Sequence, residues 1–183
     1  MNRTLKYTLF LLIMGIVAGG LLALVNSFTA PIIEERQRQA VMEALGEHFD
    51  YQDYSLDKAN EYPERNKNIL AIYFAFDSEG KVAAVIYQTS AKGYGGQIVS
   101  LIGIKADGSF DNVVVVEASG ETKGLGTQVL DFDFGVNNES VNDYSYNSIS
   151  GATVSSEAVH IGIDVAAAHF KSIQGTLGGI TNE

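Results

Sequence analysis

The fold is decided by residues 69–118, ILAIYFAFDSEGKVAAVIYQTSAKGYGGQIVSLIGIKADGSFDNVVVVEA, in which four apolar runs are separated by turn residues. Runs of this length, rich in Val, Ile, Tyr and Phe and bounded by Asp, Ser and Gly, are typical of β-strands. We expect two hairpins, one built from residues 69–76 and 81–89 and the other from residues 98–105 and 110–118.

The two hairpins repeat each other. Gly80 aligns with Gly108, and Gly96 aligns with Gly124 at the same offset. Two copies are too few for a solenoid, so the pattern predicts duplicated hairpins within one twisted, mainly antiparallel sheet. The all-valine run 113–116 predicts a central strand that is covered on both faces.

Helices are expected to flank this sheet, which makes the fold class α+β. Residues 31–46 have a helical spacing of apolar side chains and end at a glycine. Residues 49–68 are polar and predict an irregular connection. After a turn-rich region at 137–148, residues 155–172 carry an apolar face typical of a helix that packs on a sheet. The tail, 175–183, is expected to be frayed.

An apolar run without charged side chains occupies residues 7–25, and it is long enough to cross a bilayer. Arg3 and Lys6 precede it, and this slight basic bias favours a cytoplasmic N-terminus. A cleaved signal peptide is the alternative. The run is long for a signal peptide, and Pro31 follows the small residue Ala30 at the most suitable cleavage position, so we expect a retained single-pass anchor.

Three parts are therefore expected: a membrane anchor over 1–30, a helix and irregular connection over 31–68, and one binding domain over 69–183. The last two would lie on the extracytoplasmic side. Small residues recur every fourth position in the anchor, and they either form a docking stripe for another membrane helix or reflect the glycine content that is normal in such helices. These residues are Gly15, Gly19 and Ala23.

Charge and composition remove several classes of function. The chain has 12 Lys and Arg against 22 Asp and Glu, a net charge of -10, which argues against nucleic-acid binding. The lack of cysteine excludes disulfides, thiol nucleophiles and cysteine-ligated metal clusters. His48, His160 and His169 are too scattered for a metal site, so redox chemistry would need an organic cofactor.

The start of the expected C-terminal helix is a candidate phosphate site. Thr153 lies just before it, where unpaired N–H groups and the helix dipole attract an anion, and Ser155 and Ser156 add hydroxyls. The alternative is that Thr153 or Ser155 is an ordinary N-cap and that the glycine-rich loops are plain turns. Tyr94, between glycines, is placed to stack on a flat ring.

Three short motifs, in this order, resemble the loops of a known family: GYGG at 93–96, ETKGLG at 121–126, and SGAT followed by VSS at 150–156. The last is similar to the covalent flavin-attachment motif of the FMN-binding domain. This domain occurs in the G subunit of Rnf complexes and in the C subunit of the sodium-pumping NADH:quinone reductase. The implied cofactor-binding residues are Tyr94, Gly95, Gly96, Glu121, Thr122, Gly124, Leu125, Gly126, Ser150, Gly151 and Ala152, with Thr153 as the attachment residue.

The resemblance implies an electron-transfer subunit that bears FMN through a phosphoester to Thr153, made by a separate flavin transferase. Its partners would be other membrane and redox subunits of a complex that couples ferredoxin–NAD oxidoreduction to sodium or proton translocation. No catalytic residue and no metal is expected on this chain. Two alternatives stay open: a membrane-anchored module that binds FMN noncovalently, and a free-standing extracellular flavin reductase.

The chain departs from the family's usual pattern at a few positions. Asn147 stands where the transferase recognition pattern carries aspartate, three residues before the serine. Lys123 stands where proline is common, and Ser119 and Gly120 stand where a histidine often precedes the loop. The first departure concerns the efficiency of modification, and the others concern flavin potential or partner contacts.

Overall fold

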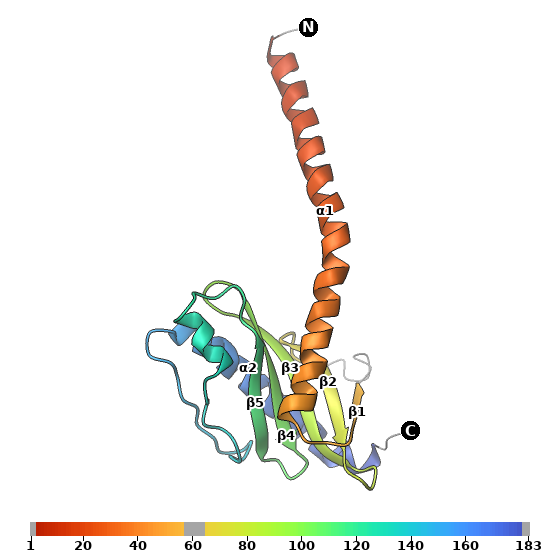
Figure 1. The fold of residues 1–183 in the computed structure, drawn as a ribbon, viewed down its shortest axis with the longest axis vertical. Coiled ribbons are helices and arrows are strands. Elements are labelled where there is room, and N and C mark those ends of the chain that lie inside the picture. The colour runs from red at the N-terminus through yellow and green to blue at the C-terminus, as the bar shows by residue number, and fades with distance from the viewer. Residues whose placement is uncertain (1–2, 57–64, 181–183) are drawn as a thin grey trace. The chain divides into compact units, whose positions relative to one another are not determined.

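The computed structural model describes residues 3–56 and 65–180, and it divides the chain into two units, Met1–Met42 and Glu43–Glu183 (Figure 1). One helix, α1 (Arg3–His48), supplies most of the first unit and the beginning of the second. The expectation of a separate helix starting at residue 31 is wrong, because Pro31 lies inside α1. A proline removes one helical hydrogen bond, but good helix formers such as Glu, Gln, Arg and Ala follow it here and continue the helix.

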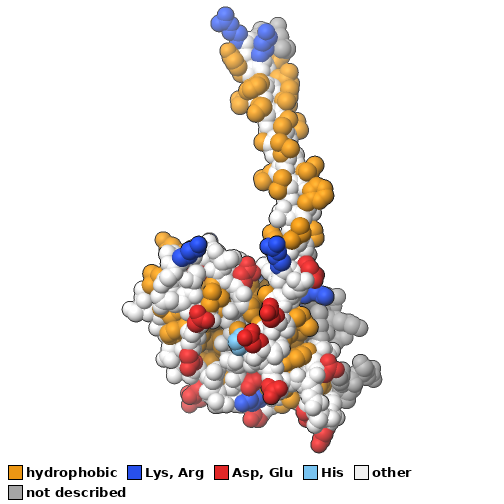
Figure 2. Space-filling model, in the orientation of Figure 1, with side chains coloured by type: hydrophobic (Ala, Val, Ile, Leu, Met, Phe, Trp, Pro, Cys, Tyr) orange, Lys and Arg blue, Asp and Glu red, His pale blue; other side chains and the backbone are white. Residues whose placement is uncertain are grey.

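Helix α1 contains the expected anchor. Within the part of the chain that the structure describes, it is the one helix long and apolar enough to cross a membrane. Figure 2 shows hydrophobic side chains along its length, and the side chains of residues 3–29 are all exposed. Apolar surface of this extent calls for an apolar environment, which a bilayer supplies.

The second unit is built on a five-stranded antiparallel sheet with the order β1-β2-β3-β4-β5. Four of the strands follow the predicted hairpins closely, and both aligned turn glycines adopt left-handed backbone conformations, with φ of +73° at Gly80 and +91° at Gly108. The strands are β1 (Asp53–Leu56), β2 (Ile69–Phe76), β3 (Val82–Lys92), β4 (Gln97–Lys105) and β5 (Phe110–Glu117).

Two strand expectations were wrong. The region 49–68 is not wholly irregular, because β1 pairs with β2 at the edge of the sheet. Strand β5 lies at the other edge rather than in the centre. Its valines are nonetheless partly covered on both faces: Val115 is buried in the core, while Val114 and Val116 are half-buried on the opposite face. A continuous apolar run in a strand therefore indicates that both faces of the strand are covered. It does not indicate that both edges of the strand are paired with neighbouring strands.

Helix α2 (Thr153–Ile173) covers one face of the sheet and packs on β3 and β4 (Figure 1). Its residues Val159, Ile163 and Phe170 are fully buried in this core. On the opposite face, Phe49 lies against Gly103, where a Cβ would come within 2.5 Å of the phenylalanine ring. Two short 3-10 helices, η1 (Gly126–Leu130) and η2 (Gln174–Gly179), complete the fold. The tail expected to be frayed thus contains η2, with Leu177 buried, and residues 181–183 lie outside the described residues.

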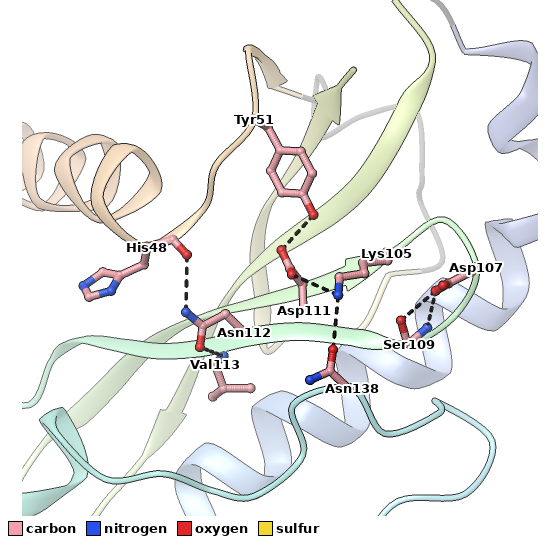
Figure 3. Close-up of polar contacts among 9 residues, drawn as sticks. All are labelled: His48, Tyr51, Lys105, Asp107, Ser109, Asp111, Asn112, Val113 and Asn138. Carbon is pink, nitrogen blue, oxygen red and sulfur yellow. Dashed lines mark hydrogen bonds and ion pairs between the residues drawn. The ribbon is translucent and has the colours of Figure 1, made fainter. Parts of the chain in front are cut away.

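A polar network fixes the segment after α1 to the β4–β5 hairpin (Figure 3). Tyr51 donates its hydroxyl proton to Asp111 at 2.7 Å, and the Lys105 ammonium lies 3.5 Å from the other oxygen of that carboxylate. Lys105 also donates to Asn138 Oδ1 at 3.3 Å. Burial raises the pKa of Tyr51, and the hydrogen bond to the Asp111 carboxylate raises it further, so the hydroxyl stays a donor.

Candidate functional site

The three motif loops enclose one cavity of about 400 Å³, within the range typical of small-molecule sites. In an antiparallel meander, alternate connections emerge at the same end of the sheet, which brings the 93–96 connection beside the chain that leaves β5. The first turn of α2 completes the wall. The lining residues are Tyr94, Glu121, Thr122, Leu125, Gly126, Gly151, Ala152, Thr153, Val154 and Ser155.

Thr153 is the first residue of α2, and its side chain is exposed to the cavity that it lines. The helix begins two residues earlier than expected. Its N-cap is Ala152, which has no side chain capable of capping, so neither Thr153 nor Ser155 is the N-cap that the alternative interpretation required. The first-turn N–H groups therefore lack a side-chain cap, which leaves the positive end of the helix dipole open to an anion.

The other two hydroxyls of the motif are buried and engaged within the protein. Ser155 donates to Glu121 Oε2 at 2.5 Å, and Ser156 Oγ accepts the N–H of Ile149 at 3.0 Å. These bonds tie α2 to the ETKGLG loop on one side and to the chain just before SGAT on the other. Among the three hydroxyls, Thr153 is the exposed one.

Glu121 joins the loops to one another. Its side chain is 5% exposed, and its Oε1 accepts the N–H groups of Gly95 at 2.9 Å and Gly96 at 3.3 Å, while Oε2 accepts from Ser155. Burial by itself would raise the pKa of Glu121, but the hydrogen bonds from Ser155 and from the amides of Gly95, Gly96 and Tyr94 outweigh it and hold the pKa below its usual value. The carboxylate is therefore ionised at neutral pH.

Glycine is required where these loops meet. A Cβ on Gly95 would overlap the carbonyl oxygen of Gly120, and a Cβ on Gly96 would lie 3.0 Å from the Gly120 Cα atom. Gly126 is similarly tight, because a Cβ there would lie 2.6 Å from Glu121 Oε2. The backbones of Gly95 and Gly96 approach Gly120 too closely for side chains and shape the cavity from behind, while Gly126 leaves room for the Glu121 carboxylate.

Eight of the twelve expected site residues line the cavity, namely Tyr94, Glu121, Thr122, Leu125, Gly126, Gly151, Ala152 and Thr153. Gly95 and Gly96 do not line it and instead hold Glu121, while Ser150 and Gly124 lie outside the lining. Sequence reasoning missed Val154 as a lining residue and the Ser155–Glu121 bond.

Helix α2 also contacts the segment that leads into the SGAT motif. His160 is buried, and its Nε2 lies 2.9 Å from the carbonyl oxygen of Asn147, while its ring stacks on Tyr146 with centroids 3.8 Å apart. The Asn147 side chain itself is exposed and lies against Gly135. The departure from aspartate at Asn147 thus falls on the surface, where it leaves the backbone contacts of the motif in place.

The residues around the cavity fit FMN. Tyr94, Leu125 and Val154 are 74%, 40% and 51% exposed, and they offer apolar contact for a flat ring system. The uncapped start of α2 suits a phosphate, and the Thr153 hydroxyl is close to it. The described residues contain no group of three or more His, Asp or Glu side chains able to hold a metal ion.

Comparison with known proteins agrees with this geometry. Residues 93–168 match the FMN-binding domain, and residues 1–47 match the RnfG N-terminal region. The chain is 29% identical over 164 residues to the G subunit of an ion-translocating oxidoreductase complex from Haemophilus influenzae, covering 79% of this chain and 77% of the relative.

Two more distant relatives match over a greater length. The G subunit of the complex of the same name from Methanosarcina acetivorans is 27% identical over 89% of this chain and 94% of its own. The G subunit of the Na(+)-translocating ferredoxin:NAD(+) oxidoreductase complex from Acetobacterium woodii is 27% identical over 92% of both chains. With both its anchor region and its flavin domain matched in this order, the chain belongs to the family of G subunits of Rnf-type ion-translocating oxidoreductase complexes.

Proposed function

We propose that the chain is an electron-transfer subunit that carries FMN on Thr153 through a phosphoester bond. The observation that carries the proposal is the exposed Thr153 hydroxyl in the wall of the cavity, at a helix start without a side-chain cap. Ser155 and Ser156 are buried and hydrogen-bonded, so they are not available as acceptors. A bond through the phosphate leaves the redox ring chemically unmodified.

Each part of the cavity has a separate task in this proposal. When bound, FMN supplies electron transfer in steps of one or two electrons. The first-turn N–H groups of α2 would hold the phosphate. The Thr153 oxygen would accept the FMN phosphoryl group from an activated flavin donor, and its proton would be lost as the donor's phosphoanhydride bond breaks and the rest of the donor leaves. Tyr94, Leu125 and Val154 contact the ring and exclude water from part of its surface. An exposed acceptor also suits attachment by a separate flavin transferase, because another protein must reach it.

The relatives' names supply the wider context. They describe subunits of ion-translocating oxidoreductase complexes, one of them named as a Na(+)-translocating ferredoxin:NAD(+) oxidoreductase. We therefore place this chain in a membrane complex that couples ferredoxin–NAD oxidoreduction to sodium or proton transport. The basic residues before the apolar part of α1 favour a cytoplasmic N-terminus, which puts the FMN domain on the extracytoplasmic side. Partner subunits must then carry electrons across the bilayer.

The attachment is tested by the mass of the intact chain together with in-gel flavin fluorescence after acid precipitation. The native chain is expected to carry one FMN adduct, and Thr153→Ala is expected to lose it while keeping its fold. Thr122→Ala is the matched control, since it removes an exposed threonine hydroxyl from the same cavity and should keep the adduct. Thr153→Ser retains the attacking oxygen and should keep some label.

Other outcomes select the alternatives. Flavin that washes away from the denatured native chain would favour a module that binds FMN noncovalently. A chain that carries FMN but purifies from membranes without integral partner subunits would favour a free-standing flavin reductase. Covalent flavin on Thr153→Ala would refute the assignment of the acceptor.

A further inference from the structure

Glu121 is a buried carboxylate in the wall of the cavity, and the proposed attachment does not use it. Both of its oxygens are occupied by donors of this chain: two backbone N–H groups on Oε1 and the Ser155 hydroxyl on Oε2. The ion pairs of the described residues do not include Glu121, so hydrogen-bond dipoles rather than a cation stabilise its charge. The negative charge is thus fixed in position and is not neutralised.

We infer that Glu121 has two separable roles: its hydrogen bonds position the loops, and its fixed negative charge lowers the reduction potential of the flavin in this cavity. The inference rests on the proposed function only in requiring that FMN occupies the cavity. It makes Glu121 a positioning and tuning residue, with no part in bond making.

The positioning role follows from the three segments that Glu121 joins. The GYGG connection, the ETKGLG loop and the first turn of α2 meet at this one side chain. A glycine-rich connection has little side-chain packing of its own to hold it, so the two N–H bonds to Glu121 fix where Tyr94 stands beside the cavity.

The tuning role follows from Coulomb repulsion. Reduction adds electrons to the flavin, and a nearby fixed anion makes that addition less favourable, the more so where water is scarce and the effective dielectric constant is low. Glu121 is 5% exposed and lines the same cavity as Thr153, so solvent screens its charge poorly. Surface carboxylates of this acidic chain are screened by water and salt and have little effect at the same distance.

The substitution Glu121→Gln separates the two roles. Glutamine has the same shape, its carbonyl oxygen can accept the N–H groups of Gly95 and Gly96, and its NH₂ group can donate to Ser155, whose hydroxyl rotates to accept. The hydrogen bonds survive and the charge is lost. We therefore expect Glu121→Gln to keep its FMN and its thermal melting curve, and to have a midpoint potential more positive than that of the native chain.

The experiment is a reductive titration of the purified full-length chain with dithionite. Flavin absorbance monitors the reduction, and dyes of known potential in the same solution give the midpoint potential. Glu157→Gln is the matched control: it makes the same change in net charge at an exposed position of α2 outside the cavity lining, and its potential should equal that of the native chain. A native potential in fully loaded Glu121→Gln, or an equal shift in both variants, would overturn the tuning role.

A second variant keeps the inference testable if the amide is not tolerated. Ser155→Ala retains Glu121 but removes a donor that partly offsets its charge, so the potential should move in the negative direction, and an unchanged potential would contradict the tuning role. A Glu121→Gln chain that fails to fold would contradict the claim that the two roles are separable. The adduct mass of the native chain is measured alongside, so a failure of covalent attachment is recognised separately, and the titration can then be run with added FMN.

Discussion

The close approach of two loop backbones behind the cavity predicts the outcome of Gly95→Ala. The added methyl group would overlap the carbonyl oxygen of Gly120, and a backbone carbonyl cannot rotate away as a side chain can. Overpacking of this kind typically destabilises a protein by about 1–3 kcal/mol. Because the obstacle is main chain, we expect the upper end, about 3 kcal/mol.

Glycine-to-alanine substitutions at two other positions show how much smaller the loss of stability should be without a backbone overlap. Gly96→Ala brings its Cβ 3.0 Å from the Gly120 Cα atom, which a small backbone shift relieves, so about 1 kcal/mol is expected. Gly175→Ala meets nothing within 4 Å and does not have a positive φ, so the free energy of unfolding should stay unchanged or rise slightly.

The assay is urea unfolding of the full-length chain in detergent, followed by near-ultraviolet circular dichroism of its nine tyrosines, since the chain has no tryptophan. With a slope of about 2 kcal/mol per molar urea, a loss of 3 kcal/mol lowers the midpoint by about 1.5 M. Equal midpoints for Gly95→Ala and Gly175→Ala would refute the contact between the two loops and, with it, the assembly of the cavity from separate segments.

Three further predictions concern pH, the polar network and topology. Burial and the charge of Arg65 lower the pKa of His169, so the folded state binds fewer protons than the unfolded state just below about pH 6.5. Stability should therefore fall as the pH drops from 7.5 to 5.5 in urea titrations, and less steeply in His169→Gln. Tyr51→Phe removes the hydrogen bond to Asp111 and should lower the free energy of unfolding by about 1 kcal/mol in the same assay; no change would show that the bond contributes nothing. Ser145→Cys gives the chain a single cysteine at an exposed position, which should react with a membrane-impermeant thiol reagent on intact cells, whereas labelling only after lysis would place the FMN domain in the cytoplasm.

The sequence predicted those parts of the fold that local patterns determine. Apolar runs and turn residues located four strands to within about three residues, since each strand end lies within two residues of a Gly, Asp, Asn or Ser. Long-range pairing has no such local signal. Strand β1 contains polar residues and is defined by its hydrogen bonds to β2, and the edge position of β5 depends on which strands its neighbours select.

The motifs of the site were predictable from the sequence, but the hydrogen bonds between them were not. The three loops were identified by their residues, and Thr153 was singled out as the acceptor. That Glu121 bonds Ser155, 34 positions away, depends on how α2 is laid across the sheet, which no spacing in the sequence reveals. From the sequence, Glu121 was expected only as one of the cofactor-binding residues of its loop, and the structure adds that both of its oxygens accept hydrogen bonds from the protein.

The order of the motifs along the chain follows from the topology of the sheet. A meander returns to the same end after every second strand, so a loop after β3 and a loop after β5 must lie together, while the turns at Gly80 and Gly108 lie at the other end. The duplicated hairpin therefore places two glycine-rich backbones side by side, and the long segment 131–150 brings the start of α2 to them. At this junction the carboxylate of Glu121 and the hydroxyls of Ser155 and Ser156 form hydrogen bonds that connect the segments, whereas Thr153 is exposed. The attachment proposed for Thr153 needs an acceptor that is reachable while its surroundings stay fixed, and this division among the neighbouring hydroxyls would meet both requirements.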